Sequence, residues 1–360
     1  MNKKELELYI HIPFCVRKCS YCDFLSAPAT EQTREAYMAA LFAEIGGRAK
    51  DYSDRTVTSI FIGGGTPSLL SGEQIGQLMD RIREQFAMAQ DAEITMEVNP
   101  GTASAEKLRN FYTAGINRLS IGMQSAQAEE LKNLGRIHDF EGFCQVYREA
   151  VEAGFTNINV DIMSGLPGQT LASYRDTLEK VLHLEPMPQH ISAYSLIVEE
   201  GTPFAAMAER GELPLPEEET ERAMYEETIE VLAKYGFHRY EISNYARDGY
   251  ECRHNVGYWI RRDYLGFGIG AASLIDNVRF QNEKSLGAYL AHPLESREEE
   301  QTLTVQDRME ETMFLGLRLT RGVSCVDFAE QYGRTVEEVY GEVIARNVAD
   351  GLLTVTERKE

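Results

Sequence analysis

Hydrophobic and polar positions in the first two hundred residues follow two alternating patterns. Short β-rich runs are each followed by a stretch in which apolar residues recur three or four positions apart, as on one face of a helix. One such stripe comprises Ile75, Leu78, Met79, Ile82 and Phe86. The alternation predicts a parallel β-sheet covered by helices, with strands at residues 8–13, 59–62, 94–98, 118–122, 157–163 and 190–196.

The residues at the ends of these strands favour one type of parallel sheet. Nearly every predicted strand ends in polar or glycine-rich residues. In a (β/α) barrel all these carboxyl ends meet on one face, which carries the site. An open sheet would concentrate its ligand contacts at one switch point. The pattern therefore favours a barrel.

The pattern changes after residue 200. A helix is predicted at residues 217–235, followed by a β-rich, aromatic segment at 237–275 and a charged linker at 295–301. Helical periodicity then returns, and the chain ends with a strand-like run. We predict a large domain over residues 1–290 and a small winged-helix-like domain over 300–360, with helices at 309–319, 324–333 and 336–349 and a wing strand at 352–356.

The charge of the chain narrows the classes of partner. Thirty-six Lys and Arg residues face 57 Asp and Glu residues, which gives a formal net charge of −21. This excess argues against binding to nucleic acid or to an anionic membrane surface. Glu5 and Glu7 interrupt any signal-peptide core, and the longest apolar run, 266–275, is too short to cross a bilayer. We therefore expect a cytoplasmic protein.

Three of the six cysteines form a cluster, Cys15-x3-Cys19-x2-Cys22. In a reducing compartment such crowding indicates a metal centre rather than a disulfide. Thiolates bind iron–sulfur clusters or zinc, and His11 could complete a zinc site. Three cysteines on a cubane would leave one iron open to a substrate. The scattered cysteines are expected to be small buried hydrophobic residues: Cys144, Cys252 and Cys325.

The cysteine spacing, with Tyr21 before Cys22, resembles the signature of radical S-adenosylmethionine (SAM) enzymes. The resemblance implies a partial (β/α)6 barrel of the TIM type, with a [4Fe–4S] cluster on the three cysteines. SAM would chelate the open iron, and an electron from the cluster would cleave it to a 5′-deoxyadenosyl radical. The difficult chemistry then belongs to the cofactors, while the protein binds and orients them.

The resemblance also implies a SAM site on the rim of the barrel. Gly64, Gly65 and Thr66 lie in a loop similar to the family's glycine motif, where the backbone can approach a ligand closely. Arg136 could pair with the SAM carboxylate. The other residues expected at the SAM site lie at or near strand ends or beside the cysteines: Tyr9, Tyr21, Glu97, Gln124, Asp161 and Ala272.

Longer motifs are similar to the oxygen-independent coproporphyrinogen III oxidase (HemN) group over essentially the whole chain. They are residues 9–15, 63–68, 97–100 and 161–169. Two features separate this chain from the oxidase. Phe24 stands where the oxidase has a fourth cysteine, and only fourteen residues precede Cys15. Residues 254–259 resemble the HNxxYW motif of HemW-type proteins, which are regarded as heme chaperones.

The resemblance to HemW-type proteins implies a heme site and no assigned catalytic residue. His254 is the expected heme ligand, and Tyr258 and Trp259 offer flat apolar surfaces to a porphyrin. Positive charge for the propionates is expected from residues beside the motif, namely Arg253, Arg261 and Arg262.

The expected function is delivery of heme to an acceptor hemoprotein, by analogy membrane-associated respiratory machinery, from a monomer or dimer. A porphyrinogen oxidase and a radical SAM methyltransferase are the alternatives. Related proteins usually continue past the wing into a final helix, so we expect an incomplete or differently closed C-terminal domain.

Overall fold

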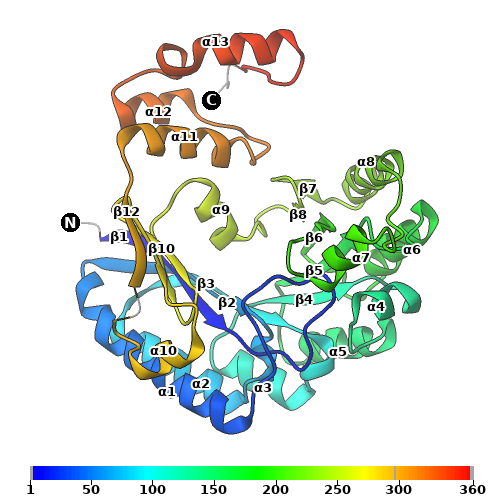
Figure 1. Cartoon of the computed structure of the whole chain (residues 1–360), viewed down its shortest axis with the longest axis vertical. Coiled ribbons are helices and arrows are strands. Elements are labelled where there is room, and N and C mark those ends of the chain that lie inside the picture. The colour runs from blue at the N-terminus through cyan, green and yellow to red at the C-terminus, as the bar shows by residue number, and fades with distance from the viewer. Residues whose placement is uncertain (1–2, 296, 357–360) are drawn as a thin grey trace.

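A single twisted sheet forms the centre of the computed structural model, which describes residues 3–295 and 297–356 (Figure 1). Its strand order is β12-β11-β10-β9-β1-β2-β3-β4-β5-β6-β8-β7. Strands β1 to β6 are parallel neighbours in chain order, as predicted: β1 Lys4–Ile12, β2 Arg55–Gly64, β3 Ala87–Val98, β4 Arg118–Gln124, β5 Ile158–Ser164 and β6 His190–Ser195. Among the described strands the two edges do not pair, so the barrel is partial.

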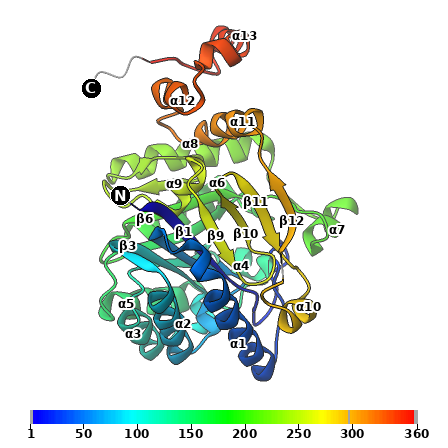
Figure 2. The same cartoon turned by 90° about the vertical axis from the view of Figure 1, so that its left-hand side faces the viewer.

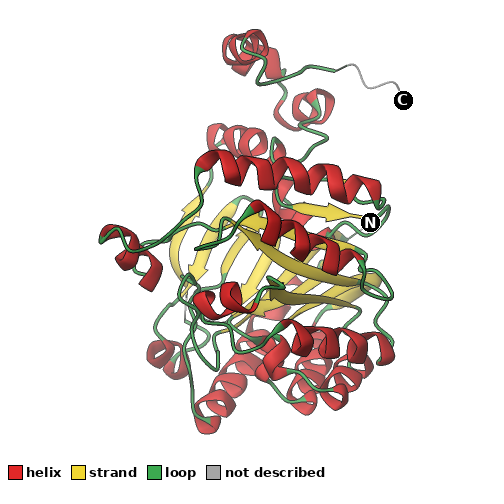
Figure 3. Ribbon diagram, turned by 90° about the vertical axis from the view of Figure 1, so that its right-hand side faces the viewer, coloured by secondary structure: helices red, strands yellow, loops and turns green. Residues whose placement is uncertain are grey.

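Helices cover the convex side of this sheet (Figures 1 and 3). Helix α2, Gly72–Gln85, begins at a capping box between Ser71 and Gln74 and buries its predicted stripe. Phe86 lies just past its end and leads into β3. The other helices of this part are α1 Glu31–Arg48, α3 Ala105–Thr113, α4 Ala128–Leu134, α5 Phe140–Glu152, α6 Leu171–Leu182, α7 Pro203–Glu209 and α8 Glu218–Lys234.

Six further strands extend the sheet at both edges. Strand β9, Tyr264–Phe267, pairs in parallel with β1, and three antiparallel strands continue from it (Figure 2). These are β10 Ala272–Ile275, β11 Val278–Asn282 and β12 Arg297–Thr302; at the other edge lie β8 Asn244–Ala246 and β7 His238–Arg239. The remaining helices are α9 Arg253–Trp259, α10 Leu286–Ala291, α11 Val305–Gly316, α12 Cys325–Tyr332 and α13 Val336–Ala349.

Four sequence predictions, most of them for the later part of the chain, are wrong. Residues 297–301 of the expected linker belong to β12, whose charged side chains are all exposed while its backbone pairs with β11. Residues 352–356 form no strand, and the described chain offers them no partner strand. Cys144 is half-buried and Cys325 is exposed, whereas both are expected to be buried. The segment 237–275 is β-rich, as predicted, with strands β7 to β10, and it also contains helix α9.

Helix α11 attaches the C-terminal helices to the barrel next to α9 (Figure 1). Glu311 on α11 is buried and accepts from Arg261 at 2.8 Å, and its other oxygen lies 2.7 Å from Arg279. The guanidinium of Arg318 lies 4.2 Å from the ring centre of Trp259. Helix α11 and the residue Arg318 that follows it therefore hold the turn after α9 in place.

Candidate functional site

The three clustered cysteines lie on a loop between β1 and α1 whose base is closed by hydrogen bonds. The amide of Cys15 donates to Ala27 O at 3.2 Å, and the amide of Ala27 donates to Pro13 O at 3.0 Å. His11 Nε2 donates to Leu25 O at 2.8 Å, which leaves Nδ1 to accept from the Tyr9 hydroxyl at 3.0 Å. Burial lowers the pKa of His11. His11 therefore holds the loop through its contacts with Tyr9 and Leu25.

Three half-buried thiols, two of them with a hydrogen-bond donor beside the sulfur, suit the ligand set of an iron–sulfur cluster. Cys15, Cys19 and Cys22 are all half-buried. Thr66 Oγ1 donates to Cys15 Sγ at 3.4 Å, and Arg136 Nη1 lies 3.8 Å from Cys19 Sγ. Within residues 3–295 and 297–356, no three Cys, His, Asp or Glu side chains are placed to hold one metal ion. A cubane binds each thiolate to a different iron, and donors to sulfur tune its potential.

The glycine loop at the end of β2 lies directly against the cysteine loop. A Cβ atom on Gly65 would lie 2.7 Å from Phe14 O, and one on Gly64 would lie 2.5 Å from the His11 ring. Gly64 also has a φ of 110°, which favours glycine. Its amide donates to Glu97 Oε2 at 3.1 Å. The glycines therefore allow two loops and a half-buried carboxylate to meet.

Three of the predicted rim residues surround Gly122 near the end of β4. A Cβ atom on Gly122 would lie 2.9 Å from Gln124 Nε2, 3.2 Å from Arg136 Nη2 and 3.9 Å from Asp161 Oδ2. Arg136 Nη2 donates to Gly122 O at 2.7 Å, and Gln124 Oε1 accepts from the Tyr194 hydroxyl at 2.8 Å. The structure therefore brings together three residues, Gln124 at the end of β4, Arg136 after α4 and Asp161 within β5, that the sequence separates by up to 37 positions.

Glu97 and Asp161 are half-buried carboxyl groups, and the charge of Asp161 disfavours a charge on Glu97. Burial, assisted by repulsion from Asp161, raises the pKa of Glu97 to about 8. Burial also raises the pKa of Asp161, against hydrogen bonds from Asn159 and Ser120. A cationic ligand group placed here would stabilise both carboxylates.

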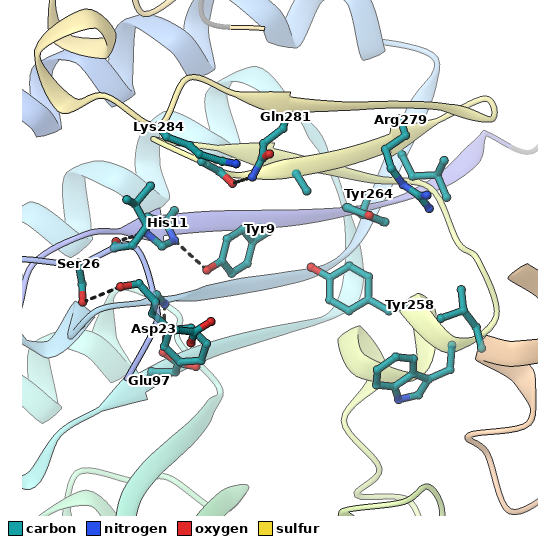
Figure 4. A pocket seen from close by; sticks show the side chains of 18 of the residues that line it. Tyr9, His11, Asp23, Ser26, Glu97, Tyr258, Tyr264, Arg279, Gln281 and Lys284 are labelled. Carbon is teal, nitrogen blue, oxygen red and sulfur yellow. Dashed lines mark hydrogen bonds between the residues drawn. The ribbon is translucent and has the colours of Figure 1, made fainter. Parts of the chain in front are cut away.

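A cavity of about 870 Å³ opens beside these residues, within the size range of small-molecule sites (Figure 4). Tyr9, Glu97 and Ala272 of the predicted SAM set line it together with Tyr258 and Trp259 of the predicted heme set. The two predicted sites thus share one space. The exposed Phe24, which replaces the oxidase's fourth cysteine, also lines it. Tyr21 instead packs in an apolar cluster with Leu134 and Met163.

His254 does not reach this cavity in the structure, although it begins the predicted heme motif. Its side chain is 1% exposed and stacks on Phe61. Its Nε2 and the Tyr258 hydroxyl are 2.9 Å apart, and its Nδ1 and Ser59 Oγ are 2.8 Å apart. Burial, assisted by Arg118, lowers its pKa to about 3. Tyr258 therefore stands between His254 and the cavity.

The three arginines beside the motif each form an ion pair with a carboxylate. Arg253 pairs with Asp91 at 3.0 Å and Arg262 with Glu5 at 3.1 Å, while Arg261 lines the cavity but is bound by Glu311. The expectation that these three arginines supply free positive charge is therefore not met. The cavity also has three cations that sequence reasoning missed, Lys18, Lys284 and Arg279, of which Arg279 is likewise bound by Glu311. Lys18 lies in the cysteine loop and could have been found there; no local signal marks the other two.

Comparisons with known proteins agree with this geometry. The sequence model of the Radical SAM superfamily matches residues 9–181, and that of the HemN C-terminal domain matches 303–359. A protein of Bacillus subtilis named heme chaperone HemW is 40% identical in a match that covers 96% of this chain and 92% of the relative. The chain belongs to the HemW family.

A second HemW, from Escherichia coli, is 37% identical, over 97% of this chain and 92% of its own. The solved structure of E. coli coproporphyrinogen III oxidase (HemN), described as a radical SAM enzyme, has a TM-score of 0.87 and 29% identity, and it covers 99% of this chain and 86% of its own. Membership of the HemW family and the superfamily match imply a [4Fe–4S] cluster and SAM. Among the described residues no helix combines the length and apolarity needed to span a bilayer.

Proposed function

We propose that this chain is a heme chaperone, which binds heme in the 870 Å³ cavity and transfers it to an acceptor hemoprotein. The observation that carries the proposal is that Tyr258 and Trp259 of the heme motif line the same cavity as Tyr9 and Glu97 of the SAM set. The names of the HemW relatives support it.

In this proposal, Cys15, Cys19 and Cys22 hold a [4Fe–4S] cluster with SAM beside it. The reduced cluster, when bound, supplies one-electron reducing power to SAM. Glu97 and Asp161 receive the positively charged amino group and the ribose hydroxyls, and Arg136 receives the carboxylate. Gly64, Gly65 and Thr66 hold the loop against the cluster, while Tyr9, Tyr21, Gln124 and Ala272 complete the surroundings.

Heme lies on the other side of the cavity in this proposal. Trp259 lines the cavity and offers a flat surface to the porphyrin, while its Nε1–H is buried and has no hydrogen-bond partner among the described residues. Lys18 and Lys284 form no ion pair within the described chain and can pair with the propionates. His254 contributes through Tyr258, which it contacts.

The remaining parts of the proposal concern organisation and partners. Residues 1–290 form the radical SAM barrel with its β-rich extension, and residues 300–360 form the HemN-type helical domain. The protein acts in the cytoplasm, as a monomer or dimer, and its acceptors include membrane-bound respiratory enzymes. It does not bind nucleic acid, in keeping with a net charge of −21.

Anaerobic reconstitution of the cluster followed by hemin titration tests this function. We expect one hemin per chain and its transfer to an apo-hemoprotein. Trp259→Ala should weaken hemin binding by about tenfold through lost aromatic contact. Tyr112→Ala, at an exposed aromatic residue on α3, serves as the matched control. Conversion of coproporphyrinogen III without stable hemin binding would establish the oxidase instead, and methyl transfer from SAM would establish the methyltransferase.

A further inference from the structure

A chain of side chains runs from the buried strands of the barrel to the cavity. Glu7 on β1 is fully buried, and within the described residues neither of its carboxyl oxygens has a hydrogen-bond partner. Its Oε2 lies 3.8 Å from His254 Nδ1, and its Oε1 lies 3.5 Å from Arg262. His254 in turn contacts the hydroxyl of Tyr258 through Nε2 at 2.9 Å.

Of these groups, only Tyr258 is open to the cavity. In Figure 4 its hydroxyl points toward the space between Tyr9 and Tyr264. Its ring is half-buried and is held edge-on against Tyr264, with ring centres 4.7 Å apart. His254 is enclosed by Phe61, Ser59 and Tyr258. A ligand in the cavity therefore meets the phenol oxygen, and the imidazole lies behind it.

We propose that Tyr258 supplies the axial oxygen ligand to ferric heme iron, with His254 as the acceptor of the phenol proton. This inference rests on the proposed heme site and names its ligand. On binding, the Tyr258 O–H bond breaks, the proton moves to His254 Nε2, and the phenolate oxygen replaces a labile ligand on iron(III). Iron keeps its oxidation state, and tyrosine is a known axial ligand of haem.

Burial and the charge of Arg118 disfavour a positively charged imidazole at His254, so the proton transfer needs an opposite charge nearby. Glu7, whose Oε2 lies 3.8 Å from His254 Nδ1, supplies that charge once it has released the proton that it holds in the folded protein at neutral pH. A carboxylate behind an imidazole also fixes the ring and its tautomer. Glu7 and Ser59 are thus positioning residues for His254.

The cavity is also lined by a second tyrosine–histidine pair, Tyr9 and His11, with which the first pair can be compared. Tyr9 bonds to His11 Nδ1, but the other nitrogen of His11 donates to the Leu25 carbonyl. That carbonyl is neutral and belongs to the backbone, so it stabilises a protonated imidazole less than a carboxylate does. Tyr9 is therefore the weaker candidate ligand.

The test uses the full-length, cluster-reconstituted protein with two probes, hemin and metal-free protoporphyrin IX. Wild type should show the charge-transfer band and resonance-Raman modes of a tyrosinate–iron(III) bond. Tyr258→Phe should lose them and raise the Kd for hemin by about tenfold or more, while Tyr112→Phe, at an exposed position on α3, keeps them. Since protoporphyrin IX has no iron, its Kd should stay within about twofold in Tyr258→Phe. His254→Gln should weaken the tyrosinate signature, with far-UV circular dichroism and iron–sulfide content confirming that it folds.

The outcomes separate the inference from the function on which it rests. Hemin binding with an unchanged spectrum in Tyr258→Phe overturns the ligand assignment and leaves the chaperone proposal standing. An equal loss of affinity for hemin and for protoporphyrin IX in Tyr258→Phe shows that the Tyr258 ring only packs against the porphyrin. This result also overturns the ligand assignment. An imidazole-ligated spectrum in wild type that disappears in His254→Gln makes His254 the ligand. Failure of wild type to bind hemin overturns the proposed function itself.

Discussion

Two walls of the cavity carry the same pair of residue types with different surroundings. On the cysteine-loop wall, Tyr9 contacts His11, which is tied to the backbone of the loop through Leu25. On the helix wall, Tyr258 contacts His254, which lies against Ser59 and the buried Glu7. The group behind His11 is a neutral backbone carbonyl, whereas the group behind His254 is the carboxyl group of Glu7. It follows that a histidine's neighbours, more than its own identity, determine whether it holds a loop or accepts a proton.

Removal of a cluster thiol should have the largest effect of the changes considered, and it should act on the cysteine-loop wall alone. Cys19→Ser is expected to lose most of its iron and sulfide after anaerobic reconstitution, because a hydroxyl is a poor ligand for the cluster. Hemin binding at the helix wall should remain. Cys144→Ser, at a half-buried cysteine on α5, should keep a full cluster. Full iron and sulfide in Cys19→Ser would contradict the cluster assignment.

The stability of the helix wall should also depend on the ion pairs that Glu311 of α11 forms with Arg261 and Arg279; this set of contacts is called the clamp. Glu311→Ala leaves Arg261, whose side chain is 4% exposed, without its carboxylate, and we expect a loss of about 3 kcal/mol in the free energy of unfolding. Thermal and urea unfolding measure this loss. Glu310→Ala, on the exposed side of the same helix, should cost well under half as much. Equal losses in the two variants would show that the clamp is unimportant.

The buried carboxyl group of Glu7 behind His254 predicts a pH dependence of stability. Burial raises the pKa of Glu7 from 4.5 to about 8, so the folded protein keeps a proton that the unfolded chain releases. The stability gained from this proton is full below pH 4.5 and is lost as the pH rises to about 8, by up to about 1.4 kcal/mol per pH unit.

Glu7→Gln should remove this part of the slope and be more stable than wild type at pH 8. Glu97 has a similarly raised pKa and contributes to the pH dependence of stability in both proteins. The quantity to measure is therefore the difference between the Tm-against-pH profiles of wild type and Glu7→Gln. Glu5→Gln, at an exposed position two residues away in the same strand, is the control. Parallel profiles for wild type and Glu7→Gln would contradict the assigned protonation of Glu7.

The smallest effect is expected on the cysteine-loop wall. His11→Gln removes the hydrogen bond to Leu25 O, worth about 1 kcal/mol, so the cluster should be lost to a chelator about fivefold faster. Hemin affinity should change little. The exposed His183→Gln is the control. A larger effect on hemin than on cluster loss would reverse the roles given to the two walls.

Local sequence signals predicted much of the barrel and indicate a cluster site on the cysteine loop. The six parallel strands and the stripe of α2 follow from hydrophobic periodicity, because burial on one face imposes that spacing. The charged strand β12 escaped prediction because its backbone pairing with β11 holds it, whereas all of its side chains are exposed. Helix α9 escaped because its seven residues are too few for a periodic pattern.

The sequence by itself determined the spacing of Cys15, Cys19 and Cys22, the order of strands and helices, and the motif that contains His254 and Tyr258. These features are local, so neighbouring residues suffice to encode them. Only the tertiary structure decided that Tyr258 faces the cavity while His254 lies behind it, and that the motif's arginines are bound elsewhere. Burial and charge pairing depend on residues far apart in the chain, such as Glu7 and His254, which meet only when β1 and α9 pack together.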